Sequence, residues 1–207
     1  MEEDVLYKKY RKKRRVIIFL SIAILSLLYM FKNASFLLRS LSAVGLLVLF
    51  YLADHLFNLD FQEKHYLFVI FIAVSSFLFS PLYYIYPQYD KIQHFVQPMM
   101  LASIVFHMVD KLNLEKKWKI VFVFFVVIGS IGVFEIGEYT LDMFFDLKLQ
   151  GVFLRNIQGL EKLDILLDRI DDTMIDMALG VLGAVVYSFF MGFILRKSLS
   201  QHSRKSS

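Results

Sequence analysis

Residues 119–145, KIVFVFFVVIGSIGVFEIGEYTLDMFF, decide the fold class of this chain. Residues 120–134 carry no ionisable side chain, and together with residues 135–145 they are long enough to cross a bilayer as an α-helix. Glu135, Glu138 and Asp142 arrive at intervals of three and four residues. This spacing places three carboxylates on one stripe of the helix. The stretch therefore predicts a membrane helix with an acidic end.

The composition of the whole chain supports a membrane protein. Of the 207 residues, 57% are hydrophobic and 20% are charged, whereas soluble domains are about 45–50% apolar. The net charge is +4, and basic residues flank apolar runs, as in residues 8–15 and 196–205. Such flanks favour topology signals and anionic lipid headgroups over nucleic acid. There is no cysteine, which excludes a disulfide framework and thiolate metal ligands.

We predict an all-α, polytopic transmembrane helix bundle of about six spans, forming a single membrane domain over residues 1–207. The predicted spans are residues 16–31, 36–56, 66–84, 91–109, 118–142 and 173–195. The distribution of Lys and Arg places both termini in the cytoplasm, with a basic N-terminus at 1–15 and a basic tail at 196–207. The expected location is the cell membrane, plasma or inner, and the expected partner is the lipid bilayer.

The connection between the fifth and sixth spans, residues 146–172, is too long for a turn and too charged for a span. Apolar residues recur along it at helical spacing, opposite charged ones: Leu160, Leu163, Leu166, Leu167 and Ile170. This pattern predicts an amphipathic helix on the outer membrane surface. A lid or binding element and a plain interfacial anchor are both compatible with it.

Ionisable residues of four predicted spans fall in one layer of the membrane. At the rise of an α-helix, Glu135 and His94 each lie about 24 Å from the cytoplasmic ends of their spans. On the same scale Asp176 lies about 30 Å and Arg39 about 22 Å from those ends. Because an isolated charge at that depth costs several kcal/mol, we expect these residues to converge on an outward-facing pocket.

Two further polar stripes support this convergence. Asp90, His94 and Gln97 are spaced i, i+4, i+7, and Asp172 and Asp176 are spaced i, i+4. On the sixth span small residues come next, which favours close helix packing: Gly180, Gly183 and Ala184. We interpret Asp54, His55 and His107 as residues of the cytoplasmic interface.

One histidine and several carboxylates from facing helices are suitable ligands for Mg²⁺, Mn²⁺, Zn²⁺ or iron. The candidate ligands are His94, Glu135, Asp142, Asp172 and Asp176. Asp90 and Glu138 are the candidate catalytic carboxylates, and Asp90 would accept a proton from water. Arg39 and Gln97 are further polar residues. Without a bound cation or protonation, six nearby carboxylates would repel one another beyond what Arg39 and His94 compensate.

Four stretches resemble, in order and spacing, the YjdF-like family of bacterial inner membrane proteins. They are YDKIQHFVQPMMLAS (89–103), FEIGEYTLDMFF (134–145), LQG (149–151) and DDTMIDMALGVLGAVV (171–186). The family pattern has Asp-x-x-x-His-Phe, Glu-x-x-Glu-aromatic (the aromatic is Tyr139), Gln-Gly in the next loop, and a closing Asp-Thr…Asp-Met…Gly-Ala. More distantly, the first and last stretches resemble VanZ-like proteins, which are associated with glycopeptide resistance. The resemblance covers about residues 80–190, although this chain carries extra sequence between Gly151 and Asp171. It implies a multi-pass membrane protein and no established reaction.

Three classes of function stay open at this point. The first is metal-dependent hydrolysis of a phosphoester or acyl bond in a lipid or cell-envelope precursor. The second is a cation- or proton-coupled transporter, in which carboxylates act as relay groups. Against it, the inner halves of the fifth and sixth spans offer few polar groups. The third is a structural or regulatory membrane protein whose cluster holds helices together.

Overall fold

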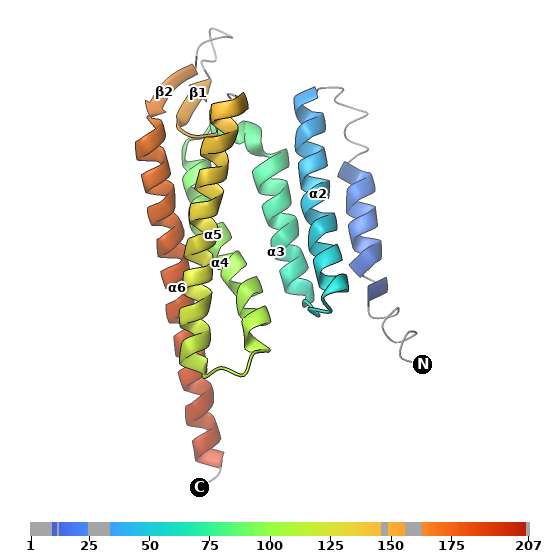
Figure 1. Cartoon of the computed structure of the whole chain (residues 1–207), viewed down its shortest axis with the longest axis vertical. Helices are drawn as coiled ribbons and strands as arrows, with labels where there is room; N and C mark the ends of the chain where they lie inside the picture. The colour runs from blue at the N-terminus through green and yellow to red at the C-terminus, as the bar shows by residue number, and fades with distance from the viewer. Residues whose placement is uncertain (1–9, 12, 25–33, 146–148, 156–162, 206–207) are drawn as a thin grey trace. The chain divides into compact units, whose positions relative to one another are not determined.

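The computed structural model describes residues 10–11, 13–24, 34–145, 149–155 and 163–205, and most of these are helical (Figure 1). The chain divides into two compact units, residues 1–80 and residues 81–207. The first unit holds helical residues 10–24 with a gap at 12, helix α2 and helix α3. The second unit holds helices α4, α5 and α6 and a short hairpin. The predicted all-α class is confirmed outside the hairpin.

Among the described residues, four helices are long and apolar enough to cross a membrane. They are α2 (Ala34–Leu56), α4 (Gln88–Asp110), α5 (Lys116–Phe145) and α6 (Arg169–Lys205). Large apolar side chains point outward from them, as at Val133 (71% exposed) and Phe189 (77% exposed). Side chains of this kind are satisfied by lipid and would aggregate in water. The second, fourth, fifth and sixth predicted spans are therefore confirmed as membrane-length apolar helices.

The other two predicted spans have different outcomes. The first, residues 16–31, is helical up to residue 24, and its remainder lies outside the described residues. The third, residues 66–84, was predicted as one helix, and this is wrong. The structure has α3 (Glu63–Ala73), then a π-helical turn η1 (Val74–Leu78), then a 3₁₀ turn η2 (Ser80–Tyr84).

Local hydrogen bonding explains why this third helix does not continue regularly. The Ser75 hydroxyl donates to the carbonyl of Phe71 at 2.7 Å, which competes with the backbone ladder. The backbone N–H of Phe79 reaches back five residues to the carbonyl of Val74 at 3.0 Å. Pro81 comes two residues later and has no N–H to donate. This run, which is apolar except for its serines, thus changes its helix type before the proline.

The first unit is organised around Asp54, whose side chain is fully buried. Its carboxylate pairs with Lys13 Nζ at 2.7 Å and accepts hydrogen bonds from the Tyr66 hydroxyl at 2.5 Å and the Phe61 N–H at 3.1 Å. Asp54 therefore lies inside the first unit, and its position at the cytoplasmic interface stays a prediction. Lys13 lies on the N-terminal helical segment and compensates the buried charge of Asp54 on α2. The hydrophobicity of α2 alone could not predict this partner, because it belongs to a different helix.

Tyr10 closes this arrangement from the N-terminal helical segment. Its hydroxyl donates to the carbonyl of Asp54 at 3.1 Å and lies 3.2 Å from Oδ1 of Asn58. Burial, and after it the charge of Asp54, raise the pKa of Tyr10, so the phenol keeps the proton that it donates. The N-terminal segment is thus fixed to the end of α2 by polar contacts.

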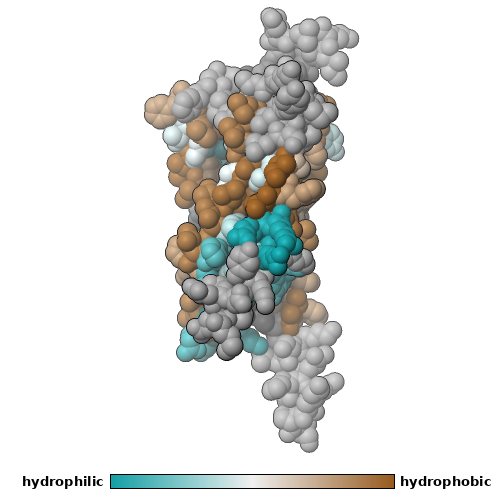
Figure 2. Space-filling model, turned by 90° about the vertical axis from the view of Figure 1, so that its right-hand side faces the viewer, coloured by the Kyte–Doolittle hydropathy of each residue, from teal (hydrophilic) through white to brown (hydrophobic). Residues whose placement is uncertain are grey.

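One face of the first unit changes from basic to apolar along the N-terminal helical segment. Arg11 and Arg15 are exposed, and Ile18, Phe19 and Ile22 come after them with more than half of their surface exposed. Figure 2 shows a hydrophilic patch below an apolar band on this face. Charged side chains at the edge of an apolar band are typical of the boundary between headgroups and acyl chains.

In the second unit α4, α5 and α6 pack against one another (Figure 1). Their shared core is apolar and consists of Ala102, Val109, Val123, Val127, Ile131 and Ala184. All acidic residues of the three helices except Asp110 lie beyond this core, near the start of α4 and α6 and toward the end of α5. Each helix therefore has an apolar body and an acidic end, and the three acidic ends coincide.

Two glycines set the distance between the helices. A Cβ atom at Gly183 would overlap the backbone carbonyl oxygen of Phe95 on α4. A Cβ atom at Gly180 would lie 2.7 Å from Cδ1 of Ile131 on α5, the far end of a flexible side chain. Both contacts lie within a few turns of the polar ends. The small residues of the sixth span therefore allow the close approach that the sequence predicted.

Helix α4 contains a proline at its centre. Pro98 is buried and has no N–H, so the carbonyl of His94, four residues earlier, receives no helical hydrogen bond from it. Helices in membranes tolerate such a break where neighbouring groups lie close. The break falls one turn from the polar end of the helix and frees a backbone acceptor there.

The predicted amphipathic helix between the fifth and sixth spans is wrong over its described part. Strand β1 (Val152–Arg155) pairs antiparallel with strand β2 (Leu163–Leu167), and the register shifts between Val152 and Phe153. Leu163, Ile165 and Leu167 occupy every second position of β2, which is the periodicity of a strand. The sequence is thus compatible with helical and with strand periodicity, and pairing with β1 selects the strand. Residues 156–162 lie outside the described residues.

The glycine contacts lead to a prediction for stability. We expect Gly183→Ala to destabilise the protein by about 1–3 kcal/mol, because the carbonyl of Phe95 can move only together with α4. Gly180→Ala should cost less, since the Ile131 side chain can rotate away. Gly129→Ala is the matched control, because a Cβ atom there meets nothing within 4 Å. Thermal unfolding in detergent would test this order, and equal midpoints for the three variants would contradict it.

Candidate functional site

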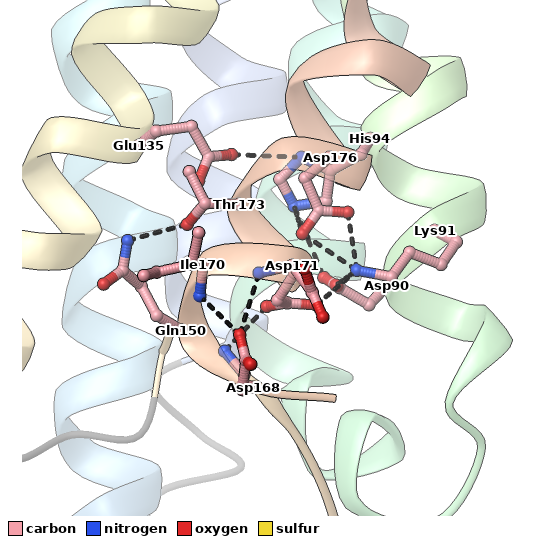
Figure 3. A network of polar contacts seen from close by, with 12 residues as sticks. Asp90, Lys91, His94, Glu135, Gln150, Asp168, Ile170, Asp171, Thr173 and Asp176 are labelled. Carbon is pink, nitrogen blue, oxygen red and sulfur yellow. Dashed lines mark hydrogen bonds and ion pairs between the residues drawn. The ribbon is translucent and has the colours of Figure 1, made fainter. Parts of the chain in front are cut away.

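Three helix ends build the polar cluster of the second unit (Figure 3). Helix α4 contributes Asp90, Lys91 and His94 in its first two turns. Helix α5 contributes Glu135, ten residues before its end, and α6 contributes Asp176, seven residues after its start. Ionisable residues of the fourth, fifth and sixth predicted spans therefore lie close together at this point in the structure. Arg39 lies on α2 in the first unit, so its part in the cluster stays a prediction.

Lys91 is the residue that sequence reasoning missed, because a lysine next to a predicted span boundary is typical of a topology signal. Its ammonium pairs with Asp172, with both oxygens of Asp176 at 2.7 and 2.9 Å, and with Asp90 Oδ2 at 3.2 Å. The Asp172 and Asp176 carboxylates are only 4% and 3% exposed. Lys91 thus supplies the positive charge that these buried carboxylates need.

His94 lies between carboxylates on both edges of its ring. Nε2 is 3.4 Å from Asp90 Oδ1 and 3.9 Å from Asp176 Oδ2. Nδ1 is 3.6 Å from Glu135 Oε1. The ring also meets Phe134 edge-on, with centroids 6.1 Å apart, which limits its rotation. The imidazole is therefore oriented with one nitrogen toward two aspartates and the other toward a glutamate.

Glu135 is the buried acid of α5 that faces His94. Its side chain is 4% exposed, and Oε1 has no hydrogen-bond partner among the residues that the structure describes. The group it faces is the imidazole of His94 (Figure 3). A buried carboxylate oxygen without a hydrogen bond is costly, and such oxygens are common where a ligand or a positioned histidine completes the site.

Two other acids hold the loop after α5. Asp142 is 3% exposed and accepts hydrogen bonds from the backbone N–H groups of Leu149 at 2.8 Å and Gln150 at 2.9 Å. Asp172 accepts the N–H of Gly151 at 2.7 Å, where the backbone has a positive φ of 91° that glycine adopts without strain. The Gln-Gly pair is therefore tied to α5 and α6 by carboxylates.

The side chain of Gln150 extends this connection. It is buried and donates from Nε2 to the Thr173 hydroxyl oxygen at 2.9 Å, in the second turn of α6 (Figure 3). Asp168 caps the same helix by accepting the N–H groups of Ile170 and Asp171, each at 2.9 Å. The start of α6 is thus fixed on both sides, which positions Asp172 and Asp176.

The remaining predicted residues lie at the margin of the cluster. Glu138 is half-buried and interacts electrostatically with Glu135, His94, Asp90 and Asp176. Gln97 donates to Gln93 Oε1 at 2.5 Å on the same helix. Tyr139 is 56% exposed, on the outer surface of α5. Glu138 therefore belongs to the site, and Tyr139 faces the surroundings.

Three side chains form a set with the spacing of metal ligands. One donor atom from each of Asp90, His94 and Asp176 lies within 4.8 Å of the other two. A nitrogen and carboxylate oxygens suit Zn²⁺, Mn²⁺ or iron, and carboxylates alone suit Mg²⁺. The set differs from the predicted ligands by the presence of Asp90 and the absence of Glu135, Asp142 and Asp172. The oxygens of Asp142 and Asp172 bind backbone N–H groups and Lys91, and Glu135 faces the other nitrogen of His94.

The sequence profile of a family described as "Predicted membrane protein (DUF2238)" matches residues 14–197. This chain belongs to that family. DUF2238 is the YjdF family, so the resemblance drawn from the sequence motifs is confirmed. The profile covers all three helix ends and the Gln-Gly loop, and the site therefore lies within the DUF2238 region. Neither the curated proteins nor the solved structures contain a significant match to this DUF2238 protein.

The loop contacts of this DUF2238 protein give a prediction. Asp142→Ala should raise the hydrogen–deuterium exchange of residues 149–151 by about tenfold or more, because two hydrogen bonds to a charged acceptor disappear. Asp142→Asn, which keeps one acceptor oxygen, should have an intermediate effect. Asp171→Ala is the control, since Asp171 is exposed on α6. Exchange in Asp142→Ala as slow as in the wild type would contradict the assigned role.

Proposed function

We propose that this membrane protein binds a divalent metal ion between Asp90, His94 and Asp176. We further propose that it uses the ion to hydrolyse a phosphoester or acyl bond in a lipid or cell-envelope precursor. The observation that carries the proposal is the orientation of His94. One ring nitrogen faces the two aspartates of the ligand set, and the other faces the buried Glu135.

This orientation is the usual one for a metal-binding histidine. A histidine ligand generally presents its second ring nitrogen to a carboxylate or carbonyl, which fixes the tautomer and raises the basicity of the ligand atom. Glu135 Oε1 is in that place, 3.6 Å from Nδ1, and has no hydrogen bond from another described group. A merely structural ion pair would not need an acid on each edge of the imidazole.

The charge of the cluster also favours a bound cation. Asp90, Glu135, Glu138 and Asp176 lie around His94, while Lys91 is the one lysine paired with the cluster among the described residues. Carboxylates so close together, within helices of membrane length, repel one another unless positive charge is added. A divalent ion would reduce this repulsion more than protonation of a single acid.

The chemistry is set by the groups at hand. A bound metal ion lowers the pKa of its water so that hydroxide forms near neutral pH. Asp90, His94 and Asp176 would hold the ion, and Glu138, which is not one of these three residues, would act as the general base. Glu138 would take the proton of the water whose oxygen bonds to phosphorus or carbonyl carbon, and would return that proton to the leaving ester oxygen.

The topology proposed for this activity has six spans with both termini in the cytoplasm of the cell. Residues 16–31 and 66–84 would complete the four membrane-length helices, the latter through the α3–η1 pair. The basic residues of the chain termini and of the connection before α5 support this orientation. The cluster would then face the extracytoplasmic side, where lipid-linked envelope precursors are processed.

A second candidate is favoured by the contacts of Lys91. By joining α4 to Asp172 and Asp176 of α6, the lysine holds two helices together, as expected for a non-catalytic structural role. A transporter has less support, because the shared core of α4, α5 and α6 is apolar in the described part of the chain. Metal binding separates the first candidate from the second.

We expect the purified wild-type protein to bind Mn²⁺ at one site, measured by electron paramagnetic resonance of the free ion. Glu135→Gln, which alters an outer partner of a ligand, should weaken binding by about tenfold, and His94→Ala and Asp176→Asn, which alter ligands themselves, should each weaken it more. His107→Ala, on the same helix, is the control. A wild-type protein that binds no Mn²⁺, together with large losses of folded yield in these variants, would favour the structural role.

A further inference from the structure

Lys91 and the candidate metal ligands use the same carboxylates. The ammonium contacts Asp90 through Oδ2, whereas His94 faces Oδ1 of the same residue. At Asp176 the sharing is direct, because Oδ2 lies 2.9 Å from Lys91 Nζ and 3.9 Å from His94 Nε2. A cation between Asp90, His94 and Asp176 would therefore compete with Lys91 for one oxygen and repel its charge.

The displaced ammonium has another carboxylate available. Asp172 pairs with Lys91 through Oδ1 but is not one of the three candidate ligands. Its second oxygen is held by the N–H of Gly151, so the carboxylate keeps its place when the lysine shifts. Lys91 has a flexible four-carbon stem and can pivot about this contact.

The exposure of the side chains indicates from which side a cation would reach the carboxylates and compete with Lys91. The side chains of Lys91 and Asp90 are 21% and 23% exposed, whereas those of Asp172 and Asp176 are 4% and 3% exposed. A solute entering the cluster therefore meets Lys91 and Asp90 before it reaches Asp176. Lys91 pairs with Asp172 and Asp176, and its side chain is more exposed than either of these two aspartates.

We propose that Lys91 determines the cation specificity of this site by acting as a tethered competitor. This inference rests on the proposed metal site between Asp90, His94 and Asp176. A monovalent cation brings the same charge as the ammonium, so it gains no Coulomb energy by displacing a lysine that is already in place. A divalent cation brings twice the charge and keeps the imidazole as an additional ligand. The site therefore takes divalent cations and rejects sodium and potassium.

The test is the affinity for Mn²⁺ in Lys91→Met and Lys91→Arg, compared with the wild type in detergent or nanodiscs. Lys91→Met keeps an unbranched side chain that is one atom shorter and removes its charge, so we expect Mn²⁺ to bind about tenfold tighter or more. Lys91→Arg keeps the charge and should bind Mn²⁺ no tighter than the wild type. Lys119→Met is the matched control, because Lys119 forms a comparable pair with Asp110 at the other end of the bundle.

Sodium gives a second readout, and its measurement on the wild type can be made without any variant. At constant ionic strength, replacing choline by sodium should leave the Mn²⁺ affinity of the wild type unchanged and should weaken Mn²⁺ binding by Lys91→Met. Competition by sodium in the wild type would overturn the inference even if Lys91→Met fails to fold.

The outcomes also distinguish this inference from the proposed function. If the wild type binds Mn²⁺ and Lys91→Met binds it no tighter, the metal site stands and the role of Lys91 is overturned. If neither protein binds Mn²⁺, the metal site fails and the inference fails with it. Binding by Lys91→Met alone would support the competition and remove the metal from the wild-type function.

Discussion

Compensation of buried charge is the constraint on which the second unit depends. Ionisable side chains on membrane-length helices are costly unless they meet partners, and here the partners come from different helices. Lys91 of α4 meets Asp172 and Asp176 of α6, and His94 meets Glu135 of α5. These contacts fix the height of each helix relative to the other two, because a shift of one turn would separate every pair.

Close packing of small residues makes these short contacts attainable. Gly183 brings α6 against the backbone of Phe95, one residue beyond His94 on α4. The distance between the helices is therefore set by backbone contact rather than by side-chain volume. Pro98 adds a freed carbonyl at His94, so the same turn combines a close approach, an irregular hydrogen-bond pattern and the central residue of the site.

Loop and helices form one polar structure at this end of the unit. Asp142 and Asp172 bind the backbone of residues 149–151, while Gln150 reaches Thr173. Asp142 and Asp172 were predicted as metal ligands, and both instead accept hydrogen bonds from the backbone. These two acids therefore hold the loop of residues 149–151 in place. The first unit has its own buried acid, Asp54, which Lys13 and Tyr66 satisfy in the same manner. In both units a lysine from a distant part of the sequence forms an ion pair with a buried aspartate and compensates its charge.

Hydrophobic length and helical spacing are local properties of a chain, so the amino-acid sequence was sufficient to predict the membrane class, four of the apolar helices and the stripes of carboxylates. It also indicated the small-residue face of α6. Which charges pair depended on the packing, since the distance between Lys91 and Asp176 is set by two helices that are far apart in the sequence. Packing likewise made Leu163–Leu167 a strand, because the hydrogen bonds of a strand come from its neighbour, and the change of helix type before Pro81 appeared only in the folded chain.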